Sequence, residues 1–594
     1  MKTLVALLAI GTAASASAQT PDPRVAAFDA YTAQAVKDWG AVGLAVAVIK
    51  DGKTVFAKGY GVRELGKPDA ADANTLFSIG STTKAMTAAA IGMLVDEGKV
   101  RWDDPVTKYL PGFELRDPYV TREVTVRDLL THRAGLANGD VLWYRNDNSA
   151  AEVLRRARFI PVGYSFRSGF TYQNVMYAAA GAVVAAVSGM PWERFVEARI
   201  FGPLGMSRTV ATLAGTAGKS NVASPHFKVA GVPRVITNAA VDPVAPAGSI
   251  WSSVVDMAKW AAFMLDSGRV DGRPLLKPAT WAELFKPQTM VPSRDFYPSQ
   301  QLTKPHWMTY GLGWFQQDYR GHMIQFHTGS IDGMVAIIGL IPDEHLGVYV
   351  LANLDHVEAR HALMFRAFDA WLGTPDRDWS TELLGLYRNL AAQGDSAEAR
   401  AERMRVPGTK PSLALEGYTG TYTDSLIGGV EIVLENGALG LVINKPIDIK
   451  LKNLFEKVEL TLERSDLADA PVYFGGPVQT ERGFVLHERL GGHEGQGGHY
   501  NSSLQIPGGL EMTTSKDVLE ALSHGAGPKK VLVTLGYSGW GAGQLEDEMS
   551  RNGWIHVGAA PEIIFDTPVQ ERYAKALSLL GIDAHMLSQD AGHA

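Results

Sequence analysis

Residues 77–84 read Phe-Ser-Ile-Gly-Ser-Thr-Thr-Lys, and an Ala- and Met-rich run continues from there to Gly98. This pattern predicts a helix, which places Ser81 and Lys84 on one helix face, about 5–6 Å apart at Cβ. A serine hydroxyl becomes a nucleophile when a neighbouring base takes its proton. Burial against the apolar run favours the neutral Lys84 amine and lowers its pKa. One helical turn therefore offers a nucleophile and its base.

The Ser-x-x-Lys pattern is short, and about one copy is expected by chance in a chain of this length. Ser81 to Lys84 is the single copy in the sequence. A serine and a lysine with no catalytic role explain it as well as a catalytic pair does. The catalytic interpretation therefore depends on partner residues elsewhere in the chain.

Length and composition limit the class of protein. At 594 residues the chain exceeds one hydrophobic core, which predicts two or three domains. A formal charge of −7, with no basic run interleaved with aromatic residues, argues against nucleic-acid binding. The absence of cysteine excludes disulfides, thiolate nucleophiles and Cys-type zinc sites. His487, His493 and His499 lie in a Gly-rich stretch that reads as a solvated loop, so we expect neither a metal nor a cofactor.

The first 18 residues have the features of a secretory signal peptide. Lys2 precedes an apolar run at residues 4–10, and an Ala-Ser-Ala site follows at 16–18. The segment is too short to span a bilayer, and no other apolar stretch reaches that length. We therefore expect cleavage after Ala18 and a periplasmic or secreted protein without a membrane span.

The next segments predict a mixture of strands and helices. Residues 42–61 form two β-rich runs around Asp51-Gly52, which indicates a hairpin with a type I′ turn. Residues 175–187 form a helix of small residues that can pack closely inside a domain. Residues 325–353 read as strand, turn and strand with the turn near Pro342, and residues 376–412 read as a charged helical linker.

A Ser/Lys hydrolase also needs a proton shuttle, an amide that orients the substrate and an oxyanion site. Tyr172 and Asn174, directly before the small-residue helix, can supply the first two. The Tyr-x-Asn pattern also occurs at 144–146 and 387–389, and we favour Tyr172 because of its place at that helix. His327-Thr-Gly329 opens a strand, where the glycine leaves room for a substrate beside backbone N–H groups. Taken alone, His327 reads more simply as an edge-strand histidine.

Together these motifs resemble one family. Ser81-Thr-Thr-Lys84, Tyr172-Gln-Asn174 and His327-Thr-Gly329, in this order, resemble the penicillin-recognising serine hydrolases over about residues 25–375. Class C β-lactamases, family VIII carboxylesterases and D-aminopeptidases are the most similar members. The resemblance implies an α/β (α+β) fold of the β-lactamase/penicillin-binding transpeptidase type, with an antiparallel sheet flanked by helices beside a helical domain.

The resemblance also implies a role for each motif residue. Ser81 is the acylated nucleophile, Lys84 its base and Tyr172 the proton shuttle. A second set binds the substrate, and two backbone N–H groups form the oxyanion hole. The substrate-binding set is Asn174, His327, Thr328 and Gly329, and the oxyanion donors are Ser81 and Ser330.

One position departs from the family pattern. β-Lactamases and transpeptidases usually carry Lys-Thr-Gly where this chain has His327-Thr-Gly. A lysine is a permanent cation for a substrate carboxylate, whereas a histidine with an ordinary pKa of about 6.5 is mostly neutral at pH 7. This argues against an efficient β-lactamase. His-x-Gly is instead similar to D-aminopeptidases and related D-amino-acid hydrolases, and this resemblance implies small esters and D-aminoacyl amides or peptides as substrates. The alternatives are a class C-like β-lactamase or D,D-peptidase, and a catalytically silent penicillin-fold sensor.

The C-terminal part of the chain has a different character. Residues 413–436 resemble the start of the lipocalin-like β-domain that often follows such hydrolases. From 437 the chain resembles the AlgH (YqgE-type) family, through the motifs at 440–446, 473–478 and 565–568. That family's own first strands are missing, and residues 413–436 are candidates to replace them. Ser538 lacks the final glycine of a Gly-x-Ser-x-Gly elbow, so we expect a glycine turn there.

The expected organisation has five parts: a signal peptide at 1–18, a hydrolase domain at 22–375, a helical linker at 376–412, a β segment at 413–436 and a separate α+β AlgH-like domain at 437–594. The sequence does not indicate a protein partner for the last domain. Either one gene encodes a fusion, or the reading joins two neighbouring sequences, and the residues alone leave both explanations open.

Overall fold

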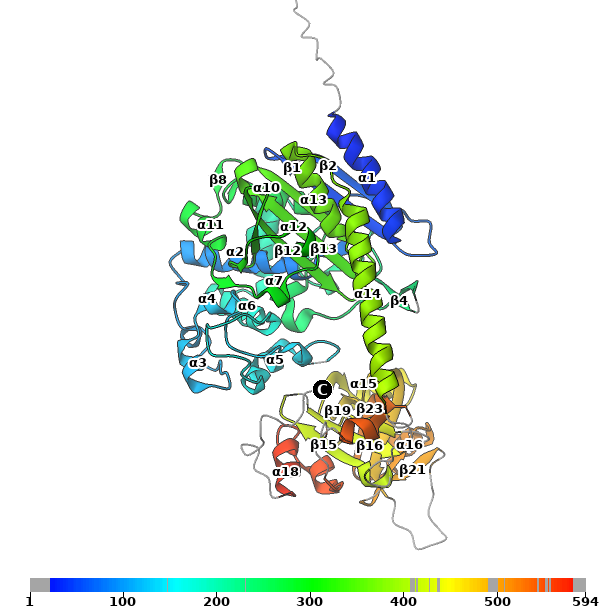
Figure 1. Ribbon diagram of the computed structural model, residues 1–594. Coiled ribbons are helices and arrows are strands. Elements are labelled where there is room, and N and C mark those ends of the chain that lie inside the picture. Colours follow the sequence, from blue (N-terminus) through cyan, green and yellow to red (C-terminus); the bar gives the residue numbers. More distant parts are fainter. Residues whose placement is uncertain are drawn as a thin grey trace, which may run out of the picture.

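The computed structural model describes residues 22–580, with gaps at 147, 230, 406–411, 413–414, 427, 435–437, 490–499, 501, 507, 542–543, 551–553 and 555–556. The expected signal peptide lies outside the described residues, as do His493 and His499. Figure 1 shows a larger N-terminal body and a smaller C-terminal body joined by the long helix α14 (Trp379–Met404). This helix lies within the stretch expected to link the two parts.

The N-terminal body is built on an eight-stranded antiparallel sheet in the order β2-β1-β14-β13-β12-β11-β10-β9. Hydrogen-bonded pairs run across the whole sheet, including β1 with β14 and β12 with β13. The strands are β1 (Gly43–Lys50), β2 (Lys53–Gly61), β9 (Thr289–Met290), β10 (Met308–Tyr310), β11 (Phe315–Tyr319), β12 (His322–Ile331), β13 (Met334–Ile341) and β14 (Leu346–Ala352).

Helices cover both faces of this sheet and form the neighbouring helical region (Figure 1). The helices of the N-terminal body are α1 (Pro23–Trp39), α2 (Thr83–Asp96), α3 (Pro118–Glu123), α4 (Val126–Leu129), α5 (Ala150–Arg156), α6 (Asn174–Ser188), α7 (Trp192–Val196), α8 (Gly202–Leu204), α9 (Ala245–Gly248), α10 (Val254–Leu265), α11 (Pro278–Leu284), α12 (Gln300–Thr303) and α13 (Ala359–Leu372). Short two-stranded pairs complete this body: β3 (Phe77–Ser78) with β6 (Trp251–Ser252), β4 (His226–Val229) with β5 (Val232–Val235), and β7 (Arg269–Val270) with β8 (Arg273–Pro274).

The two faces of the sheet belong to two apolar cores. Along β1, Ala45 and Ala47 contribute to the core shared with α10, whereas Leu44 and Val46 contribute to the core shared with α1 and α13. This alternation follows from the two-residue period of a strand. Because helices cover both faces, β1, β13 and β14 are apolar and buried along almost their whole length. The expected antiparallel sheet flanked by helices is confirmed.

Small residues bring the helices that carry the motifs close together. Helix α2 is buried from Thr83 to Leu94, so its apolar run continues around the helix instead of forming one face. A Cβ added at Gly181 of α6 would lie 2.1 Å from Cγ of Pro246 in α9. Glycine is therefore required where α6 crosses α9, and α6 takes the central place expected for it.

The hairpin of β1 and β2 turns at Asp51 and Gly52, whose φ angles are 52° and 73°, as a type I′ turn requires. The stretch 325–353 differs from the expectation because it contributes to three strands instead of two. An additional turn at Asp332 and Gly333 separates β12 from β13. Gly333 has φ of 78°, and a Cβ there would lie 2.6 Å from Cβ of Pro225. Asp332-Gly333 is a turn signal in the sequence, but the turn of this stretch was expected near Pro342 instead.

The C-terminal body is a nine-stranded mixed sheet with helices. Its main path runs β15-β16-β17-β23-β20-β22-β21, and β19 joins β18 to β23. The strands are β15 (Gly420–Asp424), β16 (Gly428–Leu434), β17 (Ala438–Leu441), β18 (Pro446–Lys450), β19 (Pro471–Phe474), β20 (Val478–Glu488), β21 (Ser503–Ile506), β22 (Leu510–Thr513) and β23 (Val531–Trp540). The helices are α15 (Leu451–Lys457), α16 (Asp517–Ser523), α17 (Gln544–Ser550) and α18 (Arg572–Ser578).

Strands from the segment 413–436 belong to this same sheet. β16 pairs with β17, which in turn pairs with β23. Tyr418, Tyr422 and Ile432 pack with Leu545 of α17 in one small core. The expected boundary at 436 therefore falls inside one sheet. Ser538 is part of β23 and pairs with Gly440, so a strand continues where we expected a glycine turn.

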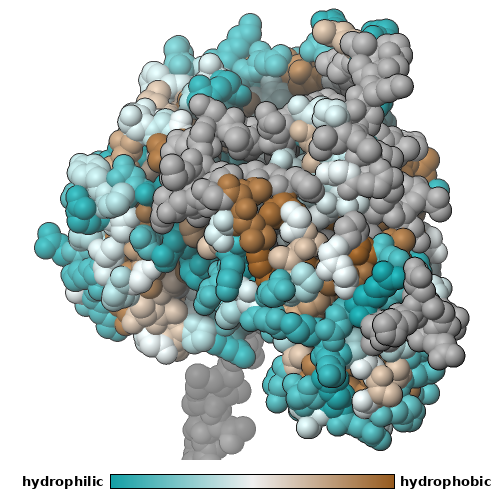
Figure 2. Space-filling model, turned by 90° about the horizontal axis from the view of Figure 1, so that it is seen from below, coloured by the Kyte–Doolittle hydropathy of each residue, from teal (hydrophilic) through white to brown (hydrophobic). Residues whose placement is uncertain are grey.

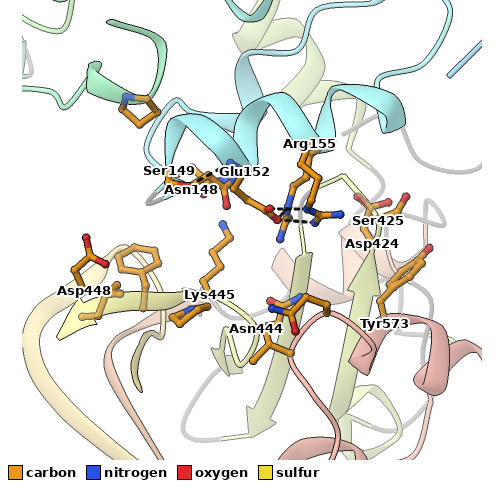
Figure 3. A pocket seen from close by; sticks show the side chains of 18 of the residues that line it. Asn148, Ser149, Glu152, Arg155, Asp424, Ser425, Asn444, Lys445, Asp448 and Tyr573 are labelled. Carbon is orange, nitrogen blue, oxygen red and sulfur yellow. Dashed lines mark hydrogen bonds and ion pairs between the residues drawn. The ribbon is translucent and has the colours of Figure 1, made fainter. Parts of the chain in front are cut away.

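Helix α5 faces the C-terminal body across a cavity of about 930 Å³ (Figure 3). Glu152 of α5 accepts hydrogen bonds from Arg155 and Arg156, and Nη1 of Arg156 donates to the carbonyl of Leu426 at 3.2 Å. Asn444, Lys445 and Asp448 line the opposite side of the cavity, with Asp424, Ser425 and Tyr573 at one end. Leu426 also packs against the apolar core of the N-terminal body, so the contact between the two bodies has polar and apolar parts.

Seen from below, most of the surface is hydrophilic, and hydrophobic residues gather near its centre (Figure 2). Among the described residues no single helix has the length and apolar composition to cross a membrane. Helix α6 and the segment Trp192–Leu204 pass that test only together, as a pair bent by 74°.

Candidate active site

Ser81 lies in a tight turn where the chain enters α2. Strand β3 pairs with β6, and a short 3₁₀ turn, Gly80–Thr82, leads directly into the helix. Gly80 has φ of 49°, and a Cβ there would lie 2.7 Å from the backbone nitrogen of Ser330. Glycine at 80 therefore permits the close approach of this turn to β12. The Ser81 side chain remains partly exposed.

The Lys84 amine reaches Ser81 from one turn further along. Its Nζ donates to Ser81 Oγ at 3.0 Å, to Asn174 Oδ1 at 2.6 Å and to the Ala247 carbonyl at 3.0 Å. The side chain is completely buried. Burial lowers the pKa of Lys84 to about 7, while the negative charge of Asp140 acts in the opposite direction. Near neutral pH a large share of the amine is therefore unprotonated and can accept the Ser81 proton.

Tyr172 lies over this pair. Its phenol lies close enough to the Ser81 hydroxyl for that group to affect its pKa, and the Lys84 Nζ lies 4.6 Å from the centre of its ring. Burial raises the pKa of Tyr172 well above its ordinary value, so the phenol keeps its proton near neutral pH. A neutral phenol between an amine and a hydroxyl can pass a proton from one to the other.

Asn174, the first residue of α6, connects Lys84 to a residue that the sequence analysis did not identify. Its Oδ1 accepts from Lys84, and its Nδ2 donates to Asp140 Oδ1 at 2.9 Å. Trp143 Nε1 donates to the same carboxylate oxygen at 2.8 Å. Asp140 belongs to the loop 138–148, and the Asn-Gly-Asp turn at 138–140 was the sequence signal that could have identified it.

The two expected oxyanion donors lie on backbone segments in close contact. A Cβ added at Gly329 would lie 2.0 Å from the Ile79 carbonyl oxygen and 3.1 Å from the Ser81 nitrogen. Gly80 likewise lies close to the backbone nitrogen of Ser330. The two close approaches place the backbone N–H groups of Ser81 and Ser330 in one region. Such a pair can stabilise the oxyanion of a tetrahedral intermediate.

His327 lies behind the site, and the structure does not place its imidazole at the cleft surface. The side chain is 1% exposed, with Nε2 3.0 Å from Tyr310 Oη and Nδ1 2.6 Å from the Thr328 carbonyl oxygen. Its ring centre lies 6.2 Å from that of Tyr172. Burial, reinforced by the Lys84 charge, lowers the pKa of His327 to about 3, so the ring is neutral. Thr328 Oγ1 lies 2.6 Å from Tyr297 Oη.

A second buried histidine, His132, packs against the ring of Tyr172. The two ring centres are 4.3 Å apart, and His132 Nδ1 accepts from the Gln173 N–H at 3.0 Å. His132 Nε2 has no hydrogen-bond partner among the described residues. Burial lowers the pKa of His132 well below its ordinary value. The His132 imidazole is therefore neutral and packs against the Tyr172 ring.

Arg360, which the sequence analysis missed, holds the end of β12 in place. Its Nη1 donates to the carbonyls of Gly329 at 2.6 Å and Ala336 at 3.0 Å, and to Ser330 Oγ at 3.0 Å. Glu358 neutralises its charge through two hydrogen bonds of 3.0 Å. No local pattern could have revealed this contact, because about 30 residues separate Arg360 from the strand end.

The competing Tyr-x-Asn patterns lie elsewhere. Tyr144 Oη donates to Asp332 Oδ1 at 2.8 Å, and Arg145 Nη2 lies 3.2 Å from Asp332 Oδ2. This loop therefore contacts the turn that follows Ser330. Tyr387 belongs to α14 and packs against Trp39. Of the three tyrosines, Tyr172 is the one that contacts Ser81.

Metal-ligating side chains do not gather in the described part of the chain: no group of three or more His, Cys, Asp or Glu residues there could hold an ion. His487 is buried, with its ring nitrogens near the Glu488 carbonyl at 2.9 Å and Thr513 Oγ1 at 3.0 Å. Its contacts are those of a structural residue of the C-terminal sheet.

Comparison with known proteins divides the chain in the same way as the structure. A family model described as Beta-lactamase matches residues 28–369, and one described as AlgH-like matches residues 432–585. The octameric penicillin-binding protein homologue from Pyrococcus abyssi is similar with a TM-score of 0.52 and 24% identity, over 70% of this chain and 88% of that chain. This similarity shows a shared fold.

The C-terminal region has relatives of high sequence identity. It is 66% identical over 160 residues to a UPF0301 protein of Cupriavidus metallidurans, which covers 27% of this chain and 80% of that protein. It is 68% identical over 160 residues to a UPF0301 protein of a Polaromonas species, with 27% and 81% covered. Both resemblances expected from the motifs are thereby confirmed. The chain belongs to the beta-lactamase family through residues 28–369 and carries an AlgH-like (UPF0301) region at its C-terminal end.

Proposed function

We propose that this protein is an exported serine hydrolase that forms an acyl-enzyme through Ser81 and acts on small esters or D-aminoacyl amides and peptides. The observation that carries the proposal is the buried Lys84 amine, 3.0 Å from Ser81 Oγ, with a pKa of about 7. An amine at this distance and with this pKa is a competent general base at neutral pH.

The proposed reaction has two stages. The Lys84 amine takes the Ser81 proton while Oγ attacks the substrate carbonyl, and the resulting oxyanion is stabilised by the backbone N–H groups of Ser81 and Ser330. The proton then passes through the Tyr172 phenol to the leaving group as the tetrahedral intermediate collapses to the acyl-enzyme. In the second stage water attacks the ester carbonyl and gives up a proton to Lys84 or Tyr172. That proton passes to Ser81 Oγ as Oγ leaves and the acid product is released.

The choice of substrate class rests on charge near β12. The imidazole of His327 is neutral, and the guanidinium groups of Arg360 and Arg145 are paired with Glu358 and Asp332. A substrate carboxylate thus lacks the fixed cation that a lysine at position 327 supplies. This supports uncharged acyl groups and aminoacyl groups over β-lactams and peptides that carry a carboxylate.

Kinetics with four substrates test the proposal. We expect kcat/KM for an acetyl ester and a D-aminoacyl anilide to exceed that for nitrocefin and for the L-aminoacyl anilide. Ser81→Ala abolishes each activity, whereas Ser538→Ala, which changes the serine of β23, has no effect. A higher kcat/KM for nitrocefin supports the β-lactamase alternative instead, and no turnover of any substrate supports the silent sensor.

The exported state is part of the proposal and has its own test. The N-terminus of the protein recovered from the periplasm or medium is expected to be Gln19. A protein that stays in the cytoplasm with Met1 intact contradicts export without affecting the chemistry at Ser81.

A further inference from the structure

Asp140 is locked in place beside the catalytic amide. One carboxylate oxygen accepts from Asn174 Nδ2 at 2.9 Å and from Trp143 Nε1 at 2.8 Å, and the other accepts from Asn138 Nδ2 at 3.3 Å. The backbone N–H of Asp140 donates to Asn138 Oδ1 at 2.8 Å. Three donors and a backbone turn hold the carboxylate, so its position is well defined before a substrate arrives.

A carboxylate accepts hydrogen bonds and, when ionised, cannot donate one. The amide of Asn174 must therefore turn its NH₂ group toward Asp140, which directs its oxygen to the other side, where Lys84 Nζ lies 2.6 Å away. With the amide reversed, two acceptors would face each other at Asp140 and two donors at Lys84. The orientation of Asn174 is thus decided by Asp140.

We propose that Asp140 is a positioning residue of the reaction: it fixes the Asn174 amide so that the amide oxygen holds the Lys84 amine against Ser81. This inference rests on the proposed function, since it concerns the same nucleophile and base. Asp140 acts through Asn174 and Lys84, without contacting the reacting serine.

The charge of Asp140 has a second effect on the same amine. The titratable groups that face Lys84 are the phenols of Tyr172 and Tyr177, the imidazoles of His132 and His327, and the carboxylate of Asp140. The phenols and imidazoles are neutral near pH 7, so Asp140 is the charged member of this set. Burial lowers the pKa of Lys84, and the Asp140 charge opposes that shift. Removal of the charge lowers the pKa of Lys84 further.

The rate at which a fluorophosphonate labels Ser81, measured from pH 5 to 9 on the full chain, tests this role. Asp140→Asn removes the charge and allows either orientation of Asn174. We expect the plateau of the labelling rate to fall about 10- to 100-fold. This factor corresponds to the free energy that a hydrogen bond to a charged group contributes. The acid limb of the pH profile moves to lower pH. Asp140→Glu keeps the charge and is expected to leave the acid limb near its wild-type position.

Two further variants distinguish a positioning role of Asp140 from a general loosening of the loop 138–148. Asn146→Ala removes a hydrogen bond to the Val141 carbonyl in the same loop and leaves the contact between Asp140 and Asn174 intact. It is expected to label like the wild type. In a double-mutant cycle on the plateau rate, Asp140→Asn adds no further loss once Asn174→Ala is present, because the interaction between the two side chains is already gone.

Three outcomes overturn the inference: an unchanged rate and pH profile in Asp140→Asn, an equal loss in Asn146→Ala, or additive losses in the cycle. Each protein in the cycle is first shown to fold by circular dichroism, because the cycle compares folded proteins. Absence of label at Ser81 in the wild type is a different result, which contradicts the proposed function itself.

Discussion

At the scale of residues, the chemistry rests on groups whose charge is set by burial. Lys84, His132 and His327 are all enclosed, and burial lowers the pKa of each. The motifs predicted that Ser81 and Lys84 meet, because helix geometry fixes that distance. They could not predict that His327 is buried, since a strand pattern does not reveal which face other elements cover. Arg360 was equally hidden, because its contacts join segments about 30 residues apart in the chain. The Asn-Gly-Asp turn marks the place of Asp140 in the sequence but not its contact with Asn174.

The buried amine predicts a specific dependence on pH. The pKa of Lys84 is lowered to about 7, and the base is the neutral form. We therefore expect kcat/KM to rise as pH increases through about 7. The pKa of His327 lies near 3, so its titration contributes nothing in this window. His327→Asn is expected to keep the midpoint of the acid limb, and a limb that disappears in this variant would assign the ionisation to the histidine instead.

Gly329 predicts a strong steric effect at the same scale. The Cβ of Gly329→Ala would lie 2.0 Å from the Ile79 carbonyl oxygen and 3.1 Å from the Ser81 nitrogen. We expect activity to fall at least about 100-fold because the nucleophile is displaced. The free energy of unfolding falls by about 1–3 kcal/mol. Gly112→Ala is the matched control, since nothing lies within 4 Å of an added Cβ there. Equal activity in both variants would contradict the close approach of β12 to Ser81.

At the scale of elements, the site lies where α2, α6, β12 and the loop 138–148 meet. The sequence allowed the β1–β2 hairpin, α2 and α6 to be predicted, because turn residues and small-residue runs mark them. The turn at Asp332 and Gly333 was not predicted, although Asp-Gly is a turn signal, because the single turn of this stretch was expected near Pro342. Tyr144 and Arg145 of the loop 138–148 contact Asp332 in this turn, two residues after Ser330, the proposed oxyanion donor.

This contact between the loop and the turn predicts a limit on substrate size. The phenol of Tyr144 and the guanidinium of Arg145 are exposed, so the contact with Asp332 is weak and its loss frees the loop. Asp332→Ala is expected to raise kcat/KM for octanoyl relative to acetyl esters by about tenfold, with the acetyl ester within about twofold of wild type. Rates for a series of acyl chain lengths measure this ratio.

Asp343→Ala, in the turn between β13 and β14, is the control, and an unchanged ratio in Asp332→Ala would show that the contact does not select substrates.

At the scale of the whole molecule, the beta-lactamase match ends at residue 369 and the AlgH-like match begins at 432, inside β16. The motifs identified both families, but the boundary of the C-terminal sheet could not be predicted, because β15 and part of β16 precede the AlgH-like motifs and still pair into that sheet. Strand pairing assigns β15 and β16 to the C-terminal sheet. β16 pairs with β17, and Tyr418 and Tyr422 pack near α17. The proposed catalytic residues Ser81, Lys84 and Tyr172 all lie in the N-terminal body.

This arrangement predicts different stabilities for two C-terminal fragments. A fragment of residues 413–594 contains β15 and β16, whereas one of residues 437–594 exposes the edge of β17 and loses Ile432 from its core. An exposed strand edge favours aggregation. We expect the longer fragment to unfold cooperatively at a higher midpoint temperature, and the shorter one to aggregate. Equal midpoints measured by circular dichroism would show that β15 and β16 are dispensable.

Mass spectrometry of the intact protein after brief exposure to a fluorophosphonate tests the central claim most directly. The account predicts one added phosphonyl group, located on Ser81 by peptide mapping, and none in Ser81→Ala or in Lys84→Met. A protein that gains no mass, or that carries the label on another residue, would contradict a nucleophilic serine at this site.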